Sequence, residues 1–124
     1  MKIKMIVEKT RTGYSAYADK YPVYTAGGDL DELKSNIVDA LNLNFEEGKT
    51  VREEDIRIVL DLPQFFEFYK VINAKALSKR IGMNQSLLAQ YIKGNKKPSS
   101  AQKKRILKGV QKVGRELAEV SFFL

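Results

Sequence analysis

The residues best suited to a chemical role lie in the second half of the chain, and most of them are cationic or neutral polar. From Phe68 to Arg115 the sequence has 10 Lys and 3 Arg but neither Asp nor Glu. Cations without neighbouring carboxylates are typical of a surface that meets a polyanion, because each can neutralise a phosphate and release its counterion. The chemistry expected here is therefore binding.

The composition excludes most catalytic and metal-binding sites. The chain has no His and no Cys, so it lacks the commonest general base and any thiolate ligand. Carboxylates could still hold two metal ions for a nuclease-like reaction, and the candidates are Glu8, Asp19, Asp29, Asp31 and Asp61. They show no ligand spacing, and Asp29 and Asp31 are explained by a helix start. We expect no enzyme activity, cofactor or metal.

The two halves of the 124 residues differ in charge. Residues 1–62 carry 9 Lys and Arg against 12 acids, whereas residues 63–124 carry 13 against 3. This asymmetry indicates a polyanion partner for the second half only. The β pattern ends near Pro63, so two small domains are expected, residues 1–62 and 63–124. The N-terminus lacks an apolar run long enough for a signal peptide or a membrane span, so a cytoplasmic protein with no membrane partner is expected.

The first half predicts an α+β domain with the order β-β-β-α-β. Apolar and polar residues alternate with a period of two, which indicates half-buried strands, at residues 3–7, 14–18, 22–26 and 56–62. Between the third and fourth strands, Asp29 and Glu32 have the form of a capping box. The apolar residues that follow recur at helical spacing, so a helix is expected to run from Leu30 to near Gly48.

The second half predicts an all-α domain. Pro63 fits the first turn of a helix over residues 63–72. Asn73 can cap a helix that ends at Gly82, and Asn84 can cap another over residues 85–93 that ends at Gly94. This second helix would turn Leu88 and Tyr91 inward. Two short helices joined by a turn with Gly form the helix-turn-helix pattern.

From about Tyr69 to Leu107, the residues ALSKRIGMNQSLLAQYIKG and the following KKPS resemble the lambda-repressor-like (XRE-type) helix-turn-helix family. The resemblance implies that the second helix lies in the major groove of operator DNA, with Gln85, Ser86 and Gln90 at base-reading positions. The expected DNA contacts are Asn84, Gln85, Ser86, Gln90, Lys93, Lys96 and Lys97, with Lys103, Lys104 and Arg105 as further phosphate ligands. Ala74 departs from the pattern, because some members have Gln there, and Asn73 and Lys75 could replace it.

Each of these residues also has a plainer explanation. Surface lysines are commonly just solvated, and Gln85 and Ser86 are good residues for a first helical turn. The long exclusion of acids around the predicted helix pair favours DNA binding.

A last helix is expected after Pro98, with Ser99 and Gln102 as a capping box. Its apolar residues form a heptad-like seam at Ile106, Val110, Val113, Leu117 and Val120. Such a seam can be buried in its own domain or against a second copy in a homodimer. A basic amphipathic helix over residues 101–119 could alternatively lie on an anionic membrane surface.

Residues 13–43, GYSAYADKYPVYTAGGDLDELKSNIVDALNL, resemble the HicB antitoxin family. The resemblance implies a degenerate ribonuclease-H-like domain that blocks a small ribonuclease toxin of the HicA type, while the C-terminal domain represses the operon. The chain departs at Lys20, Tyr21 and Pro22, where the family commonly has Leu-Pro-Gly, so no toxin contacts are carried over. The alternative is a helix-turn-helix repressor whose N-terminal domain serves only dimerisation or sensing.

Overall fold

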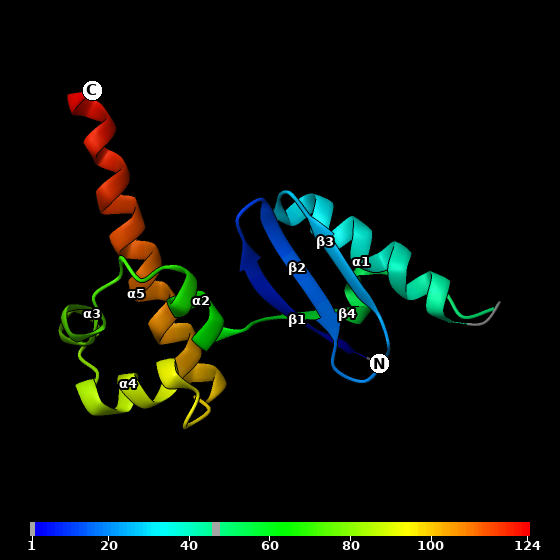
Figure 1. Cartoon of the computed structure of the whole chain (residues 1–124), viewed down its shortest axis with the longest axis horizontal. Coiled ribbons are helices and arrows are strands. Elements are labelled where there is room, and N and C mark those ends of the chain that lie inside the picture. The colour runs from blue at the N-terminus through cyan, green and yellow to red at the C-terminus, as the bar shows by residue number, and fades with distance from the viewer. Residues whose placement is uncertain (1, 46–47) are drawn as a thin grey trace. The chain divides into compact units, whose positions relative to one another are not determined.

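The computed structural model describes residues 2–45 and 48–124 and has two compact units, Met1–Phe68 (unit 1) and Tyr69–Leu124 (unit 2), as the colours of Figure 1 allow the reader to follow. The described residues form four strands in one sheet and five α-helices, so the α+β class is confirmed. The division falls after Phe68, whereas the sequence placed it between residues 62 and 63. Helix α2 (Leu62–Phe68) belongs with unit 1.

The sheet of unit 1 has the strand order β3-β2-β1-β4. Strand β1 (Ile3–Thr10) pairs antiparallel with β2 (Gly13–Ala18) and parallel with β4 (Ile56–Leu60), and β2 pairs antiparallel with β3 (Tyr24–Gly27). All four predicted strands are present in the predicted order. Strand β3 begins after Pro22 rather than at it, because proline cannot supply a backbone donor to the ladder.

Strand β4 ends earlier than predicted, and the reason lies in the residue that follows it. Asp61 accepts the N–H of Gln64 on its side chain at 3.1 Å and the N–H of Phe65 on its carbonyl at 2.9 Å. Both bonds are those of a helix N-cap. Leu62 therefore begins α2 instead of ending the strand. The predicted helix over residues 63–72 is shorter than expected, since α2 ends at Phe68.

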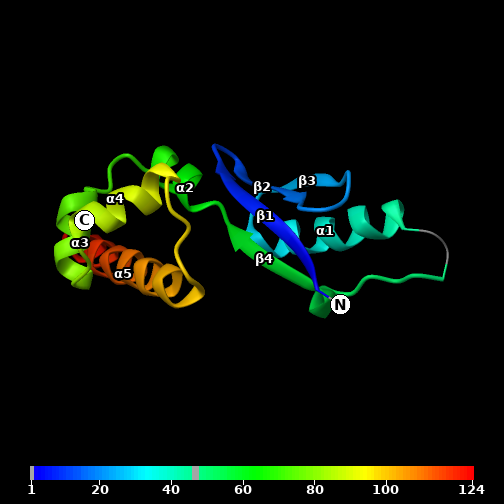
Figure 2. The ribbon, with the colours of Figure 1, turned by 90° about the horizontal axis from the view of Figure 1, so that it is seen from below.

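Helix α1 (Leu30–Asn44) covers one face of the sheet, as Figure 2 shows. The side chain of Asp29 accepts the N–H of Glu32 at 2.8 Å, which confirms the predicted N-cap. The core that α1 closes is wholly apolar and consists of Ile3, Met5, Val7, Ala16, Ala18, Val23, Leu33, Ile37, Leu41 and Val51.

The helix ends at Asn44, before the predicted end near Gly48. Phe45 is already extended, and its ring packs edge-on against Tyr21 with centroids 5.0 Å apart. Asn42 then exchanges two hydrogen bonds with the backbone of Val51, at 2.7 and 3.1 Å. These contacts turn the chain back towards the sheet, and a short 3₁₀ helix, η1 (Glu53–Asp55), leads into β4.

Unit 2 consists of three α-helices and a terminal 3₁₀ turn. They are α3 (Ala74–Ile81), α4 (Gln85–Lys93), α5 (Ser100–Ala118) and η2 (Glu119–Phe123). The side chains of Asn73 and Ser99 accept the N–H groups of Ala76 and Gln102, so the predicted caps of α3 and α5 are present. The buried apolar side chains are Leu77, Met83, Leu88, Tyr91 and Ile106.

Helix α5 packs closely against α3 at Gly109. A Cβ atom at this position would lie 2.2 Å from Cγ2 of Ile81 and 3.6 Å from Cδ1 of Leu77. Any side chain here would therefore push the two helices apart. Gly114, one turn further along α5, has nothing within 4 Å of such an atom.

We expect Gly109→Ala to lower the free energy of unfolding of the full chain by about 1 to 3 kcal/mol, because the added methyl overpacks the contact with Ile81. Gly114→Ala is the matched control, and it should raise stability by about 0.5 to 1 kcal/mol through helix propensity. Urea unfolding followed by circular dichroism measures both. Equal effects of the two substitutions would contradict the packing described here.

Candidate nucleic-acid interface

The connection between α3 and α4 is a tight turn with a left-handed residue. Gly82 has φ 67° and ψ 32°, and the N–H of Met83 donates to the carbonyl of Ser78 at 2.9 Å. The side chain of Met83 is buried. Asn84 then accepts the N–H of Leu87 at 3.1 Å and starts α4. The predicted caps at Gly82 and Asn84 are confirmed, and they fix the direction of α4 relative to α3.

One side of α4 is buried and the other is exposed. Leu88 and Tyr91 lie in the core, as predicted, and Leu88 is 0% exposed. Gln85, Ser86 and Lys93 are exposed and Gln90 is half-buried. Helical geometry places these four and Ala89 along the side that faces away from Leu88 and Tyr91. We call this set, Gln85, Ser86, Ala89, Gln90 and Lys93, the α4 stripe.

Ala89 is the member of the α4 stripe that the sequence analysis missed. It stands four residues after Gln85 and four before Lys93, which is the spacing of neighbours on one helix face. That spacing could have identified it. A methyl group between polar side chains suits contact with the methyl group of thymine.

The segment after α4 is held by the end of the helix. Gly94 is left-handed with φ 79°, and the N–H groups of Asn95 and Lys96 both donate to the carbonyl of Gln90, at 2.9 and 3.3 Å. Lys96 and Lys97 follow as exposed residues. Within residues 2–45 and 48–124, no carboxylate forms an ion pair with Lys93, Lys96 or Lys97. All seven expected DNA contacts thus lie on α4 or in the segments that flank it.

Two arginines of unit 2 have structural partners. Nη2 of Arg105 donates to the carbonyls of Ile81 and Gly82, both at 2.8 Å, and so satisfies the exposed C-terminus of α3. Arg80, from the same acid-free stretch, forms an ion pair with Glu116 of α5. Arg105 was expected among the phosphate ligands, but the unsatisfied carbonyls at the end of a helix attract a cation within the chain itself.

The Arg80–Glu116 pair also sets the protonation of its carboxylate. The hydrogen bond from Arg80 holds the pKa of Glu116 below its ordinary value, helped by the charges of Arg80 and Lys112 and opposed by desolvation. The pair joins α3 to α5 on the surface of the unit.

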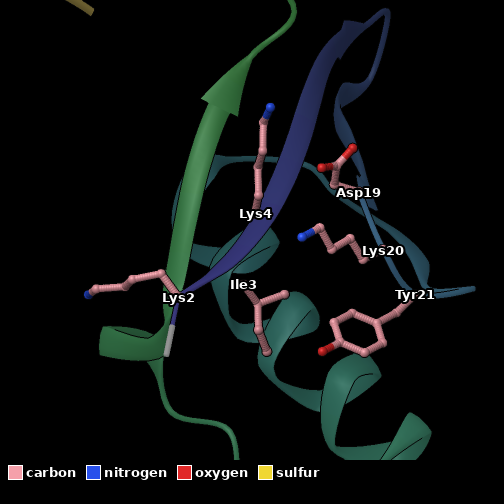
Figure 3. A pocket seen from close by; sticks show the side chains of 6 residues that line it. All are labelled: Lys2, Ile3, Lys4, Asp19, Lys20 and Tyr21. Atoms are coloured by element: carbon pink, nitrogen blue, oxygen red, sulfur yellow. The ribbon is translucent and has the colours of Figure 1, made fainter.

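Among the described residues of unit 1, the carboxylates form no candidate metal site. Asp29 and Asp61 cap helices, and in the described part of the chain no three His, Cys, Asp or Glu residues are placed to hold a metal ion. Asp19 lines a hollow of about 340 Å³ with three lysines, Ile3 and Tyr21 (Figure 3). Across residues 2–45 and 48–124, no helix has the length and apolar content that crossing a membrane requires.

We expect Glu116→Gln to be less stable than the parent chain at pH 7, because it loses the ion pair with Arg80. A carboxylate with a lowered pKa stabilises the fold above its ordinary pKa of 4.5 and stops doing so as the pH falls through the folded value. The difference in urea midpoint between the two proteins should therefore shrink as the pH falls below 4.5. Glu119→Gln is the matched control: it removes a carboxylate that forms no ion pair with the described residues and should leave the urea midpoint at pH 7 unchanged.

Comparison with known proteins gives one informative match. No family model matches the chain, and no solved structure matches it. A UPF0150 protein of Archaeoglobus fulgidus is 40% identical over 50 residues, which are 40% of this chain and 76% of that protein. With this identity over three quarters of the relative, the chain belongs to the UPF0150 family.

Proposed function

We propose that this chain is a sequence-specific DNA-binding transcriptional regulator, the antitoxin of a HicA–HicB-type pair that neutralises an RNA-cleaving toxin and represses its own operon. The observation that carries the DNA-binding part is α4. Its inner side is anchored in the core by Leu88 and Tyr91, while the α4 stripe is accessible.

The geometry of α3 and α4 supports a lambda-repressor-like helix-turn-helix. The major groove admits one α-helix, whose first turns then face the base edges. In this arrangement Gln85 can bind adenine through two hydrogen bonds, Ser86 can contact several bases, and Ala89 can contact thymine. The register of these contacts follows from the cap at Asn84.

The charges of unit 2 support the same proposal. Residues 69–124 carry 13 Lys and Arg against two acids, Glu116 and Glu119, and Glu116 is already paired with Arg80. Lys93 at the end of the α4 stripe, and Lys96 and Lys97 beyond it, supply affinity for phosphates without sequence preference. Arg80 and Arg105 hold the helices in place, and the lysines make the DNA contact.

Unit 1 supports the antitoxin part. The chain belongs to the UPF0150 family, and residues 13–43 resemble the HicB antitoxin family. The sheet order β3-β2-β1-β4, with α1 in the connection to a parallel β4, is what a degenerate ribonuclease-H-like fold requires. Residues 1–68 carry 13 acids against 9 cations. This excess would attract a basic ribonuclease by electrostatic steering.

The last helix supports a homodimer. The seam of α5 is buried at Ile106 and half-buried at Val110 and Val113, but Leu117 and Val120 are 65% and 53% exposed. In Figure 1 this end of α5 extends beyond α3 and α4. A second copy would cover the exposed end, and a two-fold dimer would read half-sites about 34 Å apart.

Two substitutions test the division between base reading and phosphate binding. Gln85→Ala should weaken binding to the operator by about 1 to 3 kcal/mol and leave binding to random duplex unchanged. Lys97→Ala should weaken both duplexes alike and reduce the slope of log K against log salt by about one. Gel-shift titrations with the region upstream of the gene, at two salt concentrations, measure both effects. Equal losses on operator and random duplex in both variants would contradict the proposal.

Co-expression tests the antitoxin part separately. We expect the chain to restore growth of cells that express a HicA-type protein from the same operon. The double substitution Lys93→Glu/Lys97→Glu should abolish repression, because it reverses the charge beside the α4 stripe, yet it should still restore growth. Loss of rescue in this variant, if it is folded, would show that neutralisation depends on unit 2.

A further inference from the structure

The face of the sheet opposite α1 carries a continuous row of apolar side chains. The strand register places Tyr24 beside Tyr17, Tyr17 beside Ile6, and Ile6 beside Val59. The row therefore crosses all four strands. Tyr24 is 70% and Tyr17 is 38% exposed, whereas Ile6 and Val59 are half-buried. We call Tyr24, Tyr17, Ile6 and Val59 the cross-strand row.

Opposite charges flank the cross-strand row. On one side, Lys4 of β1 lies beside Arg57 of β4. On the other side, Glu8 of β1 lies next to Asp61, because the pairing of Val7 with Leu60 continues through a 2.9 Å hydrogen bond from the N–H of Asp61 to the carbonyl of Val7. Alternation along the strands sends Lys4, Glu8 and Arg57 to the same face as the row. Asp61 follows β4 directly, and its side chain caps α2 beside this face.

The surroundings of Tyr17 are consistent with this placement. Its pKa is raised first by burial and then by the negative charges of Asp61, Glu8 and Asp19.

The arrangement of apolar and charged side chains on this face is self-complementary under a two-fold rotation. A two-fold axis that runs along the cross-strand row brings the rows of two copies face to face and reverses the strand direction of one of them. Position 4 of each copy then faces position 8 of the other, and position 57 faces position 61. Lys4 meets Glu8 and Arg57 meets Asp61, and each pair occurs twice. An interface between identical subunits requires a patch of this kind.

We propose that two copies of this chain associate through the cross-strand rows of their sheets, with Lys4 opposite Glu8 and Arg57 opposite Asp61 across the two-fold axis. Packed sheets lie about 10 Å apart, so the tyrosine and aliphatic side chains of the two rows can interdigitate. The contact differs from the α5 contact and does not depend on DNA binding.

The charge pattern favours a second copy over a basic ribonuclease on this face. A basic partner would gain from Glu8 and Asp61 but would meet Lys4 and Arg57 as like charges, which is unfavourable. The face carries Lys4 and Arg57 against Glu8, Asp61 and Asp19, whose N–H donates to the carbonyl of Lys4 at 3.1 Å. Most of the excess of acids in unit 1 lies elsewhere, for example at Asp31, Asp39, Glu53 and Glu54, which are all exposed.

Charge exchange tests the proposal in the full chain. In Lys4→Glu, the new carboxylate at position 4 of each copy faces Glu8 of the other copy. In Glu8→Lys, the new ammonium group at position 8 of each copy faces Lys4 of the other copy. Either change should raise the dissociation constant of one association step about tenfold or more. The double exchange Lys4→Glu/Glu8→Lys restores opposite charges across the axis and should restore the parent value.

The control is Lys4→Glu/Asp39→Lys, which has the same net charge as the double exchange but carries its new lysine on an exposed position of α1. It should associate as weakly as Lys4→Glu alone. Light scattering after size exclusion gives the mass of each variant, sedimentation equilibrium gives the dissociation constants, and circular dichroism checks that each is folded.

Two results would overturn the proposal. The first is an assembly mass that neither single exchange alters. In that case the face does not join two copies of this chain and would be available to a different protein. The second is a double exchange that associates no better than the Asp39 control. If α5 also joins two copies, loss of the sheet contact halves the mass of the assembly; if it does not, the single exchanges give monomers.

Discussion

The parallel pairing of β1 with β4 is the constraint on which unit 1 depends. Two parallel neighbours cannot be joined by a tight turn, so the chain between them has to cross one face of the sheet. The crossing contains α1, whose buried leucine and isoleucine side chains meet the odd-numbered residues of β1. Alternation then sends the even-numbered residues to the opposite face. The cross-strand row and its charged flanks are a direct result.

Helix α4 of unit 2 is short, and one of its two sides is exposed. Isolated helices of this length are marginal in water, so α4 depends on its contacts and its ends. Leu88 and Tyr91 anchor one side, and a left-handed glycine stands near each end of α4, Gly82 before it and Gly94 after it. Arg105 stabilises the preceding helix end from a different helix. The buried side and the ends of α4 thus hold the helix in place, and its exposed side is not needed for this.

Local signals in the sequence predicted most of the elements. The caps at Asp29, Asn73, Asn84 and Ser99 are all present, because a cap needs only residues within one turn. The inward direction of Leu88 and Tyr91 also followed from periodicity. The predicted ends of α1, β4 and α2 were wrong. Helix α1 ends where Phe45 packs against Tyr21, which is distant in the sequence. Strand β4 ends because Asp61 caps α2, although apolar and polar residues continue to alternate as far as Leu62.

Most of the candidate site was predictable because it depends on residues close together in the sequence. The features that were missed depend on residues far apart in the sequence. The α4 stripe needs only one helix, and four of its five members were identified. The partners of Arg80 and Arg105 lie 36 and 23 to 24 residues away in the chain. The cross-strand row depends on the register of three strand pairs, which alternation within a single strand does not reveal.

The side chain of Gln64 completes the sheet in place of a strand. It donates to the carbonyl of Lys9 and accepts its N–H, both at 2.8 Å, at a point on β1 that β4 no longer reaches. This amide occupies the free edge as a neighbouring backbone would. A chimera that keeps unit 1 and exchanges unit 2 should therefore be joined after Phe68. A junction at residue 62 would remove Gln64 and leave the backbone of Lys9 open to pairing with a strand of another molecule.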